Sequence, residues 1–233
     1  MTRVQDRGFC FDVDRHNRTT GVRHIGAYWA LLAGLLDDDR GHRLIEHLAD
    51  ETGFKRRHFP SALAADHPAF RPEGGYWRGA VWPPTTWMVL KGLERYGRHD
   101  LAHEMAVNHH EAMLQVWRDT GTVWENYAPD AIEPGAPAKR NFVGWGGLAP
   151  IAVLLEHRFG LRPDVATNRL VWEVRLRKKH GVRRYPFGPG LLLDLRCEAR
   201  AADTDEPEVT ASGTGPVAIE VRWPGGSKAL TSK

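Results

Sequence analysis

The stretch Gly74–Gly97, GGYWRGAVWPPTTWMVLKGLERYG, contains the change from loop to helix that organises this chain of 233 residues. Pro83-Pro84 predicts a helix start, because the first helical turn does not need the N–H group that proline lacks. Apolar residues then recur every three or four positions, as a helix with one buried face requires: Trp87, Leu90, Leu93 and Tyr96. Before the prolines, three aromatic side chains surround Arg78, which predicts a functional loop.

Helical spacing of apolar residues recurs in four further segments. They are residues 25–36, 44–48, 101–117 and 148–155, and the third has the longest apolar stripe. After residue 162 the pattern becomes strict alternation, which is typical of strands. The alternating runs are 170–177, 191–199 and 217–223. We therefore predict an α+β chain with a helical domain at 1–162 and an antiparallel sheet of about four strands at 163–233.

Composition and charge exclude several classes of protein. The net charge of +3 is the balance of 32 basic and 29 acidic residues spread along the chain, so we predict no nucleic-acid partner. No apolar run reaches the roughly 20 residues of a membrane helix, and the N-terminus lacks the apolar core of a secretion signal. The two cysteines are far apart and form no recognisable motif. We expect a cytoplasmic protein with no membrane association.

Two long loops, 51–82 and 121–147, contain the candidate functional residues. Loops of this length are functional or disordered, and their many tryptophans argue against disorder. Glu125 lies in TVWENYAPD, where neighbouring aromatic rings suit a catalytic base; a surface glutamate is the alternative interpretation. Arg78 can offer a planar set of donors to sugar hydroxyls or to a carboxylate. Its alternative is a stabilising stack on tryptophan.

We predict no metal site and no cofactor. The segment HHEAML begins like a zinc-binding helix, but Leu114 occupies the position of the closing histidine. The segment DVDRHNRTTG begins with two acids at calcium-loop spacing, yet Asn17 stands where such a loop needs glycine. A solvated helix face and an ordinary turn explain the two segments better.

Three segments together resemble the clan of six-hairpin glycosidases, which includes trehalase, mannosylglycerate hydrolase and the processing α-glucosidase. They are Gly74–Gly97, TVWENYAPD at 122–130 and NFVGWGGLAPIAVLLE at 141–156. Their order and spacing match the clan, and the resemblance covers nearly the whole chain. It implies an (α/α)6 barrel of helical hairpins whose active site lies in a pocket at one end. It also implies inverting hydrolysis by a general acid and a general base.

The resemblance implies a role for each matching residue. Glu125 corresponds to the general base. The substrate, an α-glucoside or α-mannoside such as a trehalose- or mannosylglycerate-like compound, would be bound by Tyr76, Trp77, Arg78, Trp82, Asn126, Tyr127 and Trp145.

The general acid that this resemblance implies has no counterpart in the chain. In the clan it is an aspartate in an upstream segment rich in tryptophan and glycine, and this chain has no such segment. Twelve helices with their connections need on the order of 300 residues, whereas only 1–162 precede the predicted sheet. We therefore expect an incomplete (α/α)6 toroid, a C-terminal portion of the full enzyme. Asp66, Glu73 and Asp130 are the substitute acids that the chain itself could offer.

Two functional hypotheses remain open from the sequence. One is a glycoside hydrolase that needs a complementary N-terminal half. The other is a non-catalytic carbohydrate-binding or interaction subunit that kept the aromatic residues and lost the acid. In both cases the helices would expose apolar faces, so we expect either the complementary half or a homo-oligomer to cover them.

Overall fold

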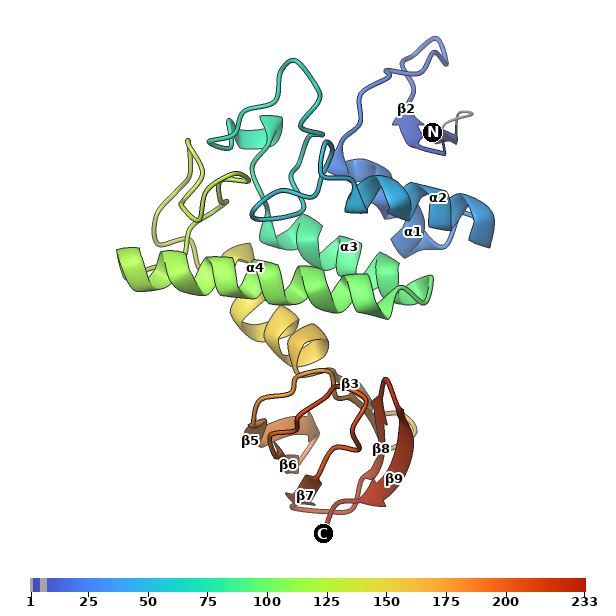
Figure 1. The fold of residues 1–233 in the computed structure, drawn as a ribbon, viewed down its shortest axis with the longest axis vertical. Coiled ribbons are helices and arrows are strands. Elements are labelled where there is room, and N and C mark those ends of the chain that lie inside the picture. Colours follow the sequence, from blue (N-terminus) through green and yellow to red (C-terminus); the bar gives the residue numbers. More distant parts are fainter. Residues whose placement is uncertain (1, 5–7) are drawn as a thin grey trace. The chain divides into compact units, whose positions relative to one another are not determined.

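The computed structural model describes residues 2–4 and 8–233, which form two compact units, Met1–Val153 and Leu154–Lys233. Figure 1 shows mainly helices and loops in the first unit and mainly strands in the second. Residues 1 and 5–7, part of the N-terminal stretch in which no secretion signal is predicted, lie outside the described residues. The units divide inside the π-helix η4 (Ala149–Arg158), so the sequence-based domain boundary at 162/163 stays a prediction.

The first unit is built from helices joined by long loops. The elements are β1 (Thr2–Val4), β2 (Cys10–Asp12), η1 (Ile25–Tyr28), α1 (Trp29–Ala33), α2 (Asp38–Ala49), η2 (Tyr76–Arg78), α3 (Pro83–Arg95), α4 (His99–Thr120), η3 (Trp145–Leu148) and η4. Every one of the five predicted helical segments coincides with or overlaps a helix of this set. Among the described residues, no helix is both long and apolar enough to cross a membrane.

Helix α3 lies at the centre of the first unit. It begins at Pro83, and the hydroxyls of Thr85 and Thr86 each donate to the carbonyl of Trp82 at 3.0 Å. A Cβ atom on Gly92 would lie 2.8 Å from the Cβ of Leu31. Glycine at this position therefore lets α1 pack closely against α3. The helix is mostly buried, which explains why its apolar residues are not confined to one stripe.

The two long loops are ordered because they pair with each other and with neighbouring segments. Isolated β-bridges hold them, with the partners His24–Leu63, Gly74–Ala136, Val81–Tyr127, Trp124–Arg140 and Tyr127–Pro134. Two of these bridges join loop 51–82 to loop 121–147. The two predicted functional loops are therefore joined by backbone pairing into one connected structure beside α3.

The second unit, all of it described, contains two sheets. The larger has the order β3 (Leu161–Asp164), β4 (Arg169–Glu173), β8 (Ala218–Trp223), β9 (Gly226–Thr231), and the smaller has β5 (His180–Gly188), β6 (Leu191–Cys197), β7 (Val209–Gly213). Apolar residues of both sheets form one core that includes Trp172, Leu193 and Ile219.

This arrangement corrects the prediction of one antiparallel sheet of about four strands. The other neighbouring pairs within residues 154–233 are antiparallel, but β4 and β8 run parallel. The smaller sheet lies between β4 and β8 in sequence, so the long connection that parallel strands need is present. The three predicted strands correspond to β4, β6 and β8. The strands β3, β5, β7 and β9 were missed because none of them has more than two large apolar residues at alternating positions.

Candidate active site

A short backbone pairing joins the two motif-bearing loops. The N–H of Val81 donates to the carbonyl of Tyr127 at 2.8 Å, and the N–H of Tyr127 donates back at 3.0 Å. Upstream, the N–H of Gly75 donates to the carbonyl of Ala136 at 3.0 Å, and the N–H of Ala136 donates to the carbonyl of Glu73 at 2.9 Å. The segments YWRGAVW and WENY, distant in sequence, therefore lie side by side.

Four aromatic rings cluster at this junction. The rings of Trp77 and Trp82 stack with centroids 4.2 Å apart and an interplanar angle of 11°. Tyr76 and Trp145 approach Trp82 edge-on, at 4.8 and 6.0 Å. Trp82 is buried, whereas Trp77 is 51% exposed and Tyr76 and Trp145 are each 39% exposed. One buried ring thus supports three rings that face solvent, an arrangement suited to stacking on a sugar.

Trp77 and Trp145 also line a pocket of about 830 Å³. This volume falls within the range of small-molecule binding sites. Most of the other lining residues come from η1, α1, α3 and the segments beside them, and they include His24, Trp29 and Trp87. Glu125 and Arg78 are not among the described residues that line this pocket. The structure therefore brings two of the predicted binding residues to one pocket and leaves these two outside its lining.

Three aromatic residues of this pocket were missed by sequence reasoning. Trp29 and Trp87 occupy apolar positions of helices and were interpreted as core, yet Trp29 is 56% exposed. His24 precedes η1, where its Nδ1 accepts from the N–H of Gly26 at 3.1 Å. Its Nε2 then carries the proton and donates to Asp12 at 2.8 Å. A histidine that precedes an aromatic helix start is a weak sequence signal for a pocket. No signal in the sequence distinguishes an exposed helical tryptophan from a buried one.

Glu125 is held in place by contacts within loop 121–147. Its N–H donates to the carbonyl of Lys139 at 2.9 Å, and its Oε2 accepts a long bond from the N–H of Lys139 at 3.4 Å. Its carbonyl accepts from the indole Nε1 of Trp145 at 3.0 Å. The residue is only 5% exposed. Glu125 is therefore fixed in position and directly connected to the aromatic cluster.

Asn126 and Tyr127 are fully buried next to Glu125. The Nδ2 of Asn126 donates to the carbonyl of Pro137 at 3.2 Å, and the hydroxyl of Tyr127 accepts from the N–H of Trp124 at 3.1 Å. Burial raises the pKa of Tyr127 to about 12, so its phenol stays neutral. Both side chains brace the loop from within, and their roles as substrate ligands stay predictions.

Arg78 is the last residue of η2 and follows Trp77 of the aromatic cluster in sequence. Its carbonyl accepts from the N–H of Arg71 at 2.8 Å, and its own N–H donates to the carbonyl of Gly75 at 3.2 Å. The residue is exposed, so its guanidinium can reach a ligand. Its contact with a sugar stays a prediction.

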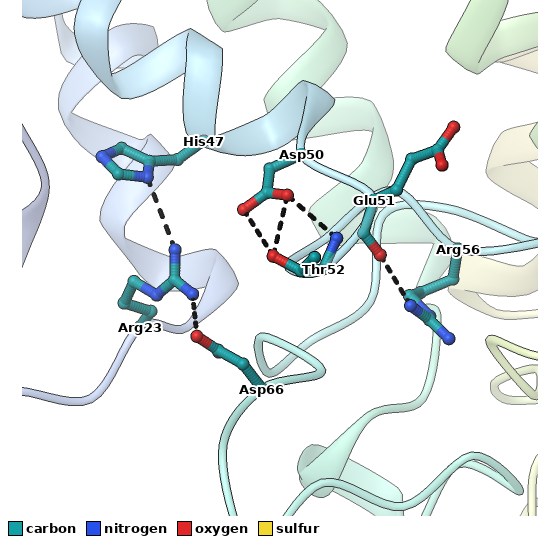
Figure 2. Close-up of polar contacts among 7 residues, drawn as sticks. All are labelled: Arg23, His47, Asp50, Glu51, Thr52, Arg56 and Asp66. Carbon is teal, nitrogen blue, oxygen red and sulfur yellow. Dashed lines mark hydrogen bonds and ion pairs between the residues drawn. The ribbon is translucent and has the colours of Figure 1, made fainter.

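Two of the proposed substitute acids already have ion-pair partners. Asp66 pairs with Arg23, which also contacts His47 Nδ1 at 3.4 Å, as Figure 2 shows. Asp130 accepts from the Nε of Arg56 at 2.7 Å. Both pairs tie loop 51–82 to other segments, so both carboxylates have a structural role. Glu73 is exposed. Across residues 2–4 and 8–233, no group of three or more His, Cys, Asp or Glu could hold a metal ion.

The comparison with known families identifies the class of protein, the glycoside hydrolases. Residues 4–142 match the mannosylglycerate hydrolase MGH1-like glycoside hydrolase domain, and the chain belongs to this family. Mannosylglycerate hydrolase of Thermus thermophilus is 32% identical over 99 residues, 42% of this chain and 23% of that protein. A probable mannosyl-oligosaccharide glucosidase of Schizosaccharomyces pombe is 27% identical over 150 residues, 58% of this chain and 18% of that protein.

Solved structures extend the similarity to the fold. The GH63 mannosylglycerate hydrolase of Thermus thermophilus in complex with glucose matches with a TM-score of 0.53 and 27% identity, over 64% of this chain and 34% of that one. Neutral trehalase Nth1 of Saccharomyces cerevisiae matches with a TM-score of 0.51 and 21% identity, over 64% and 26% of the two chains. At that identity the trehalase shows the fold alone. The chain thus spans about a third or less of these enzymes.

Proposed function

We propose that this chain forms the base-bearing part of the active site of an inverting α-glycoside hydrolase. The observation that carries the proposal is the Val81–Tyr127 pairing, which joins the aromatic cluster to the segment of Glu125. The bond from the Trp145 indole to the Glu125 carbonyl supports the same arrangement. The named activities of the relatives, a mannosylglycerate hydrolase and a glucosidase, support an α-mannoside or α-glucoside as substrate.

In this proposal Glu125 is the general base that activates the attacking water. Tyr76, Trp77 and Trp145 stack on the apolar faces of the sugar, and Arg78 donates to its hydroxyl groups. Trp82, Asn126 and Tyr127 support these groups from behind. Inversion also needs an acid whose carboxyl group lies about 6.5–9.5 Å from the base.

We further propose that the acid comes from a complementary N-terminal half, and that the present chain is an incomplete toroid. The coverage of the relatives supports this, as do the ion pairs that occupy Asp66 and Asp130. Exposed apolar side chains, among them Trp29, Leu35, Trp117 and Ile151, support a surface that the other half or a second copy covers. We place the protein in the cytoplasm, where its two free, buried thiols would stay reduced.

The second candidate function is a carbohydrate-binding subunit without catalysis. The same ion pairs favour it, because they occupy two of the three carboxylates that could substitute for the acid, Asp66 and Asp130. In that case the exposed rings of Trp77 and Trp145 would still bind sugar.

Hydrolysis and binding assays separate the two functions. The chain is incubated with mannosylglycerate, trehalose and aryl α-glycosides, alone and together with the upstream half of the Thermus thermophilus enzyme, and proton NMR follows the first anomer released. Hydrolysis with inversion supports the enzyme. Binding in calorimetry without hydrolysis in either mixture supports the binding subunit. Absence of both contradicts both.

A further inference from the structure

A pair of fully buried histidines joins helix α4 to loop 51–82. The Nε2 of His58 lies 2.8 Å from the Nδ1 of His109, and both residues have 0% exposure. Beside them, the Oδ1 of Asn108 accepts from the N–H of Phe59 at 3.1 Å, and its Nδ2 donates to the carbonyl of Arg57 at 2.9 Å. Two consecutive residues of α4 therefore hold three consecutive residues of the loop.

The other side of His58 contacts the segment that follows Glu125. The N–H of His58 donates to the carbonyl of Pro129 at 2.8 Å, and its ring centroid lies 5.6 Å from that of Tyr127. Tyr127 is also the residue that pairs with Val81. His58 thus lies between α4 and the segment of loop 121–147 that carries the proposed base.

We propose that His58 and His109 are positioning residues, a neutral pair through which helix α4 sets the position of the Glu125 segment. The catalytic consequence rests on the proposed function, whereas the positioning itself does not.

The contact needs at least one neutral ring, because across the 2.8 Å one nitrogen must donate and the other accept. Protonation of both rings would bring two N–H groups face to face. Burial lowers the pKa of His58 to about 3. Burial, followed by the neighbouring His58 and His110, holds the pKa of His109 well below its usual value. The pair therefore stays neutral at ordinary pH.

The surroundings of the pair contain charges that largely cancel. Lys55 pairs with Glu104 of α4 at 2.8 Å, and Arg56 pairs with Asp130 of loop 121–147 at 2.7 Å. Arg57 adjoins His58 in sequence, His110 adjoins His109, and the ring of Tyr127 lies 5.6 Å from that of His58.

Stability alone does not require histidines at these positions. Within the described residues, the outer nitrogens His58 Nδ1 and His109 Nε2 have no hydrogen-bond partner. An unpaired buried polar atom costs free energy, and an apolar pair of similar shape would avoid that cost. A leucine at position 109 alone leaves the buried Nε2 of His58 without its partner, at a cost of about 1–3 kcal/mol. Its effect should therefore concentrate on the position of the loop that carries His58.

Amide hydrogen exchange of the whole chain tests the positioning. In His109→Leu we expect exchange in 121–130 to become roughly 5- to 30-fold faster, while α1 and α3 keep their protection. His109→Asn, whose amide can replace the Nδ1 contact, should restore slow exchange. Gln115→Leu, at an exposed position of the same helix whose side-chain amide donates to Asp119 of that helix, is the matched control and should leave 121–130 unchanged. Unaltered exchange in His109→Leu, or an equal loss across α1, α3 and 121–130, would overturn the proposal.

A second measurement concerns catalysis in the assembled enzyme. There His109→Leu should lower kcat by at least the same factor and change KM less, because the base moves while Trp77 stays stacked on the buried Trp82. A normal kcat would overturn the proposal. If no assembly hydrolyses any glycoside, the proposed function fails, and the exchange experiment still decides the positioning by itself.

Discussion

The indole Nε1 of Trp145 donates to the main-chain carbonyl of Glu125 at 3.0 Å, so a half-exposed ring of the aromatic cluster is bonded to the residue that we propose as the base. The two residues are twenty positions apart. Any shift of the ring on binding a sugar would be transmitted to the backbone of Glu125.

Trp145→Phe keeps an aromatic ring and removes the indole donor. We expect it to lower the free energy of unfolding by about 1 kcal/mol, since the carbonyl of the nearly buried Glu125 loses its partner. Urea denaturation of the chain measures this. Trp117→Phe, at a half-exposed position of α4, should change stability by much less. Equal losses in the two variants would show that the bond contributes nothing.

Glu125→Gln keeps the shape of the side chain and removes the base. In an assembled, active enzyme we expect turnover to fall by about 10²- to 10⁴-fold. Sugar affinity, measured by calorimetry, should stay within a small factor. Glu133→Gln, an exposed glutamate of the same loop, is the matched control and should keep its activity. Undiminished turnover in Glu125→Gln would assign the base to another carboxylate.

Gly135→Ala tests the packing that supports Asn126. A Cβ at position 135 would lie 1.9 Å from the Oδ1 of Asn126, so the amide or the loop must move. We expect a loss of about 1–3 kcal/mol in the free energy of unfolding. Gly147→Ala, where no atom lies within 4 Å of the added Cβ, should be nearly neutral in the same denaturation experiment. A neutral Gly135→Ala would mean that the loop is less tightly packed than the structure indicates.

Acid should destabilise the chain through the buried histidines. Their pKa values are depressed in the folded state, so the unfolded chain takes up protons first as the pH falls below 6.5. The stabilising contribution is thus complete above pH 6.5 and is lost progressively toward pH 3, by about 1.4 kcal/mol per pH unit for each histidine. Urea denaturation at several pH values measures the slope.

His58→Leu provides the comparison for that slope. It removes one depressed group, so the stability of this variant should depend less steeply on pH between 6.5 and 4 than that of the native chain. Parallel pH profiles for the two proteins would show that His58 already takes up its proton in the folded state near its ordinary pKa.

Local patterns in the sequence determined much of the secondary structure and the family. Pro83 and the spacing after it are enough to locate α3, and the alternation around Leu170, Leu193 and Ile219 locates β4, β6 and β8. The motifs around Arg78, Glu125 and Trp145 were sufficient to identify the glycoside hydrolase resemblance. These signals are local, because helix and strand periods and loop motifs are properties of neighbouring residues.

Only the tertiary structure decided which distant residues meet. The Val81–Tyr127 bridge, the parallel pairing of β4 with β8, and the contact of His58 with His109 join segments far apart in the chain. Likewise, the tryptophans Trp29 and Trp82 both lie in ordered segments, yet Trp29 lines a pocket and Trp82 is buried. Exposure and long-range pairing depend on what packs against a residue from elsewhere in the chain. The local spacing of apolar residues therefore does not predict them.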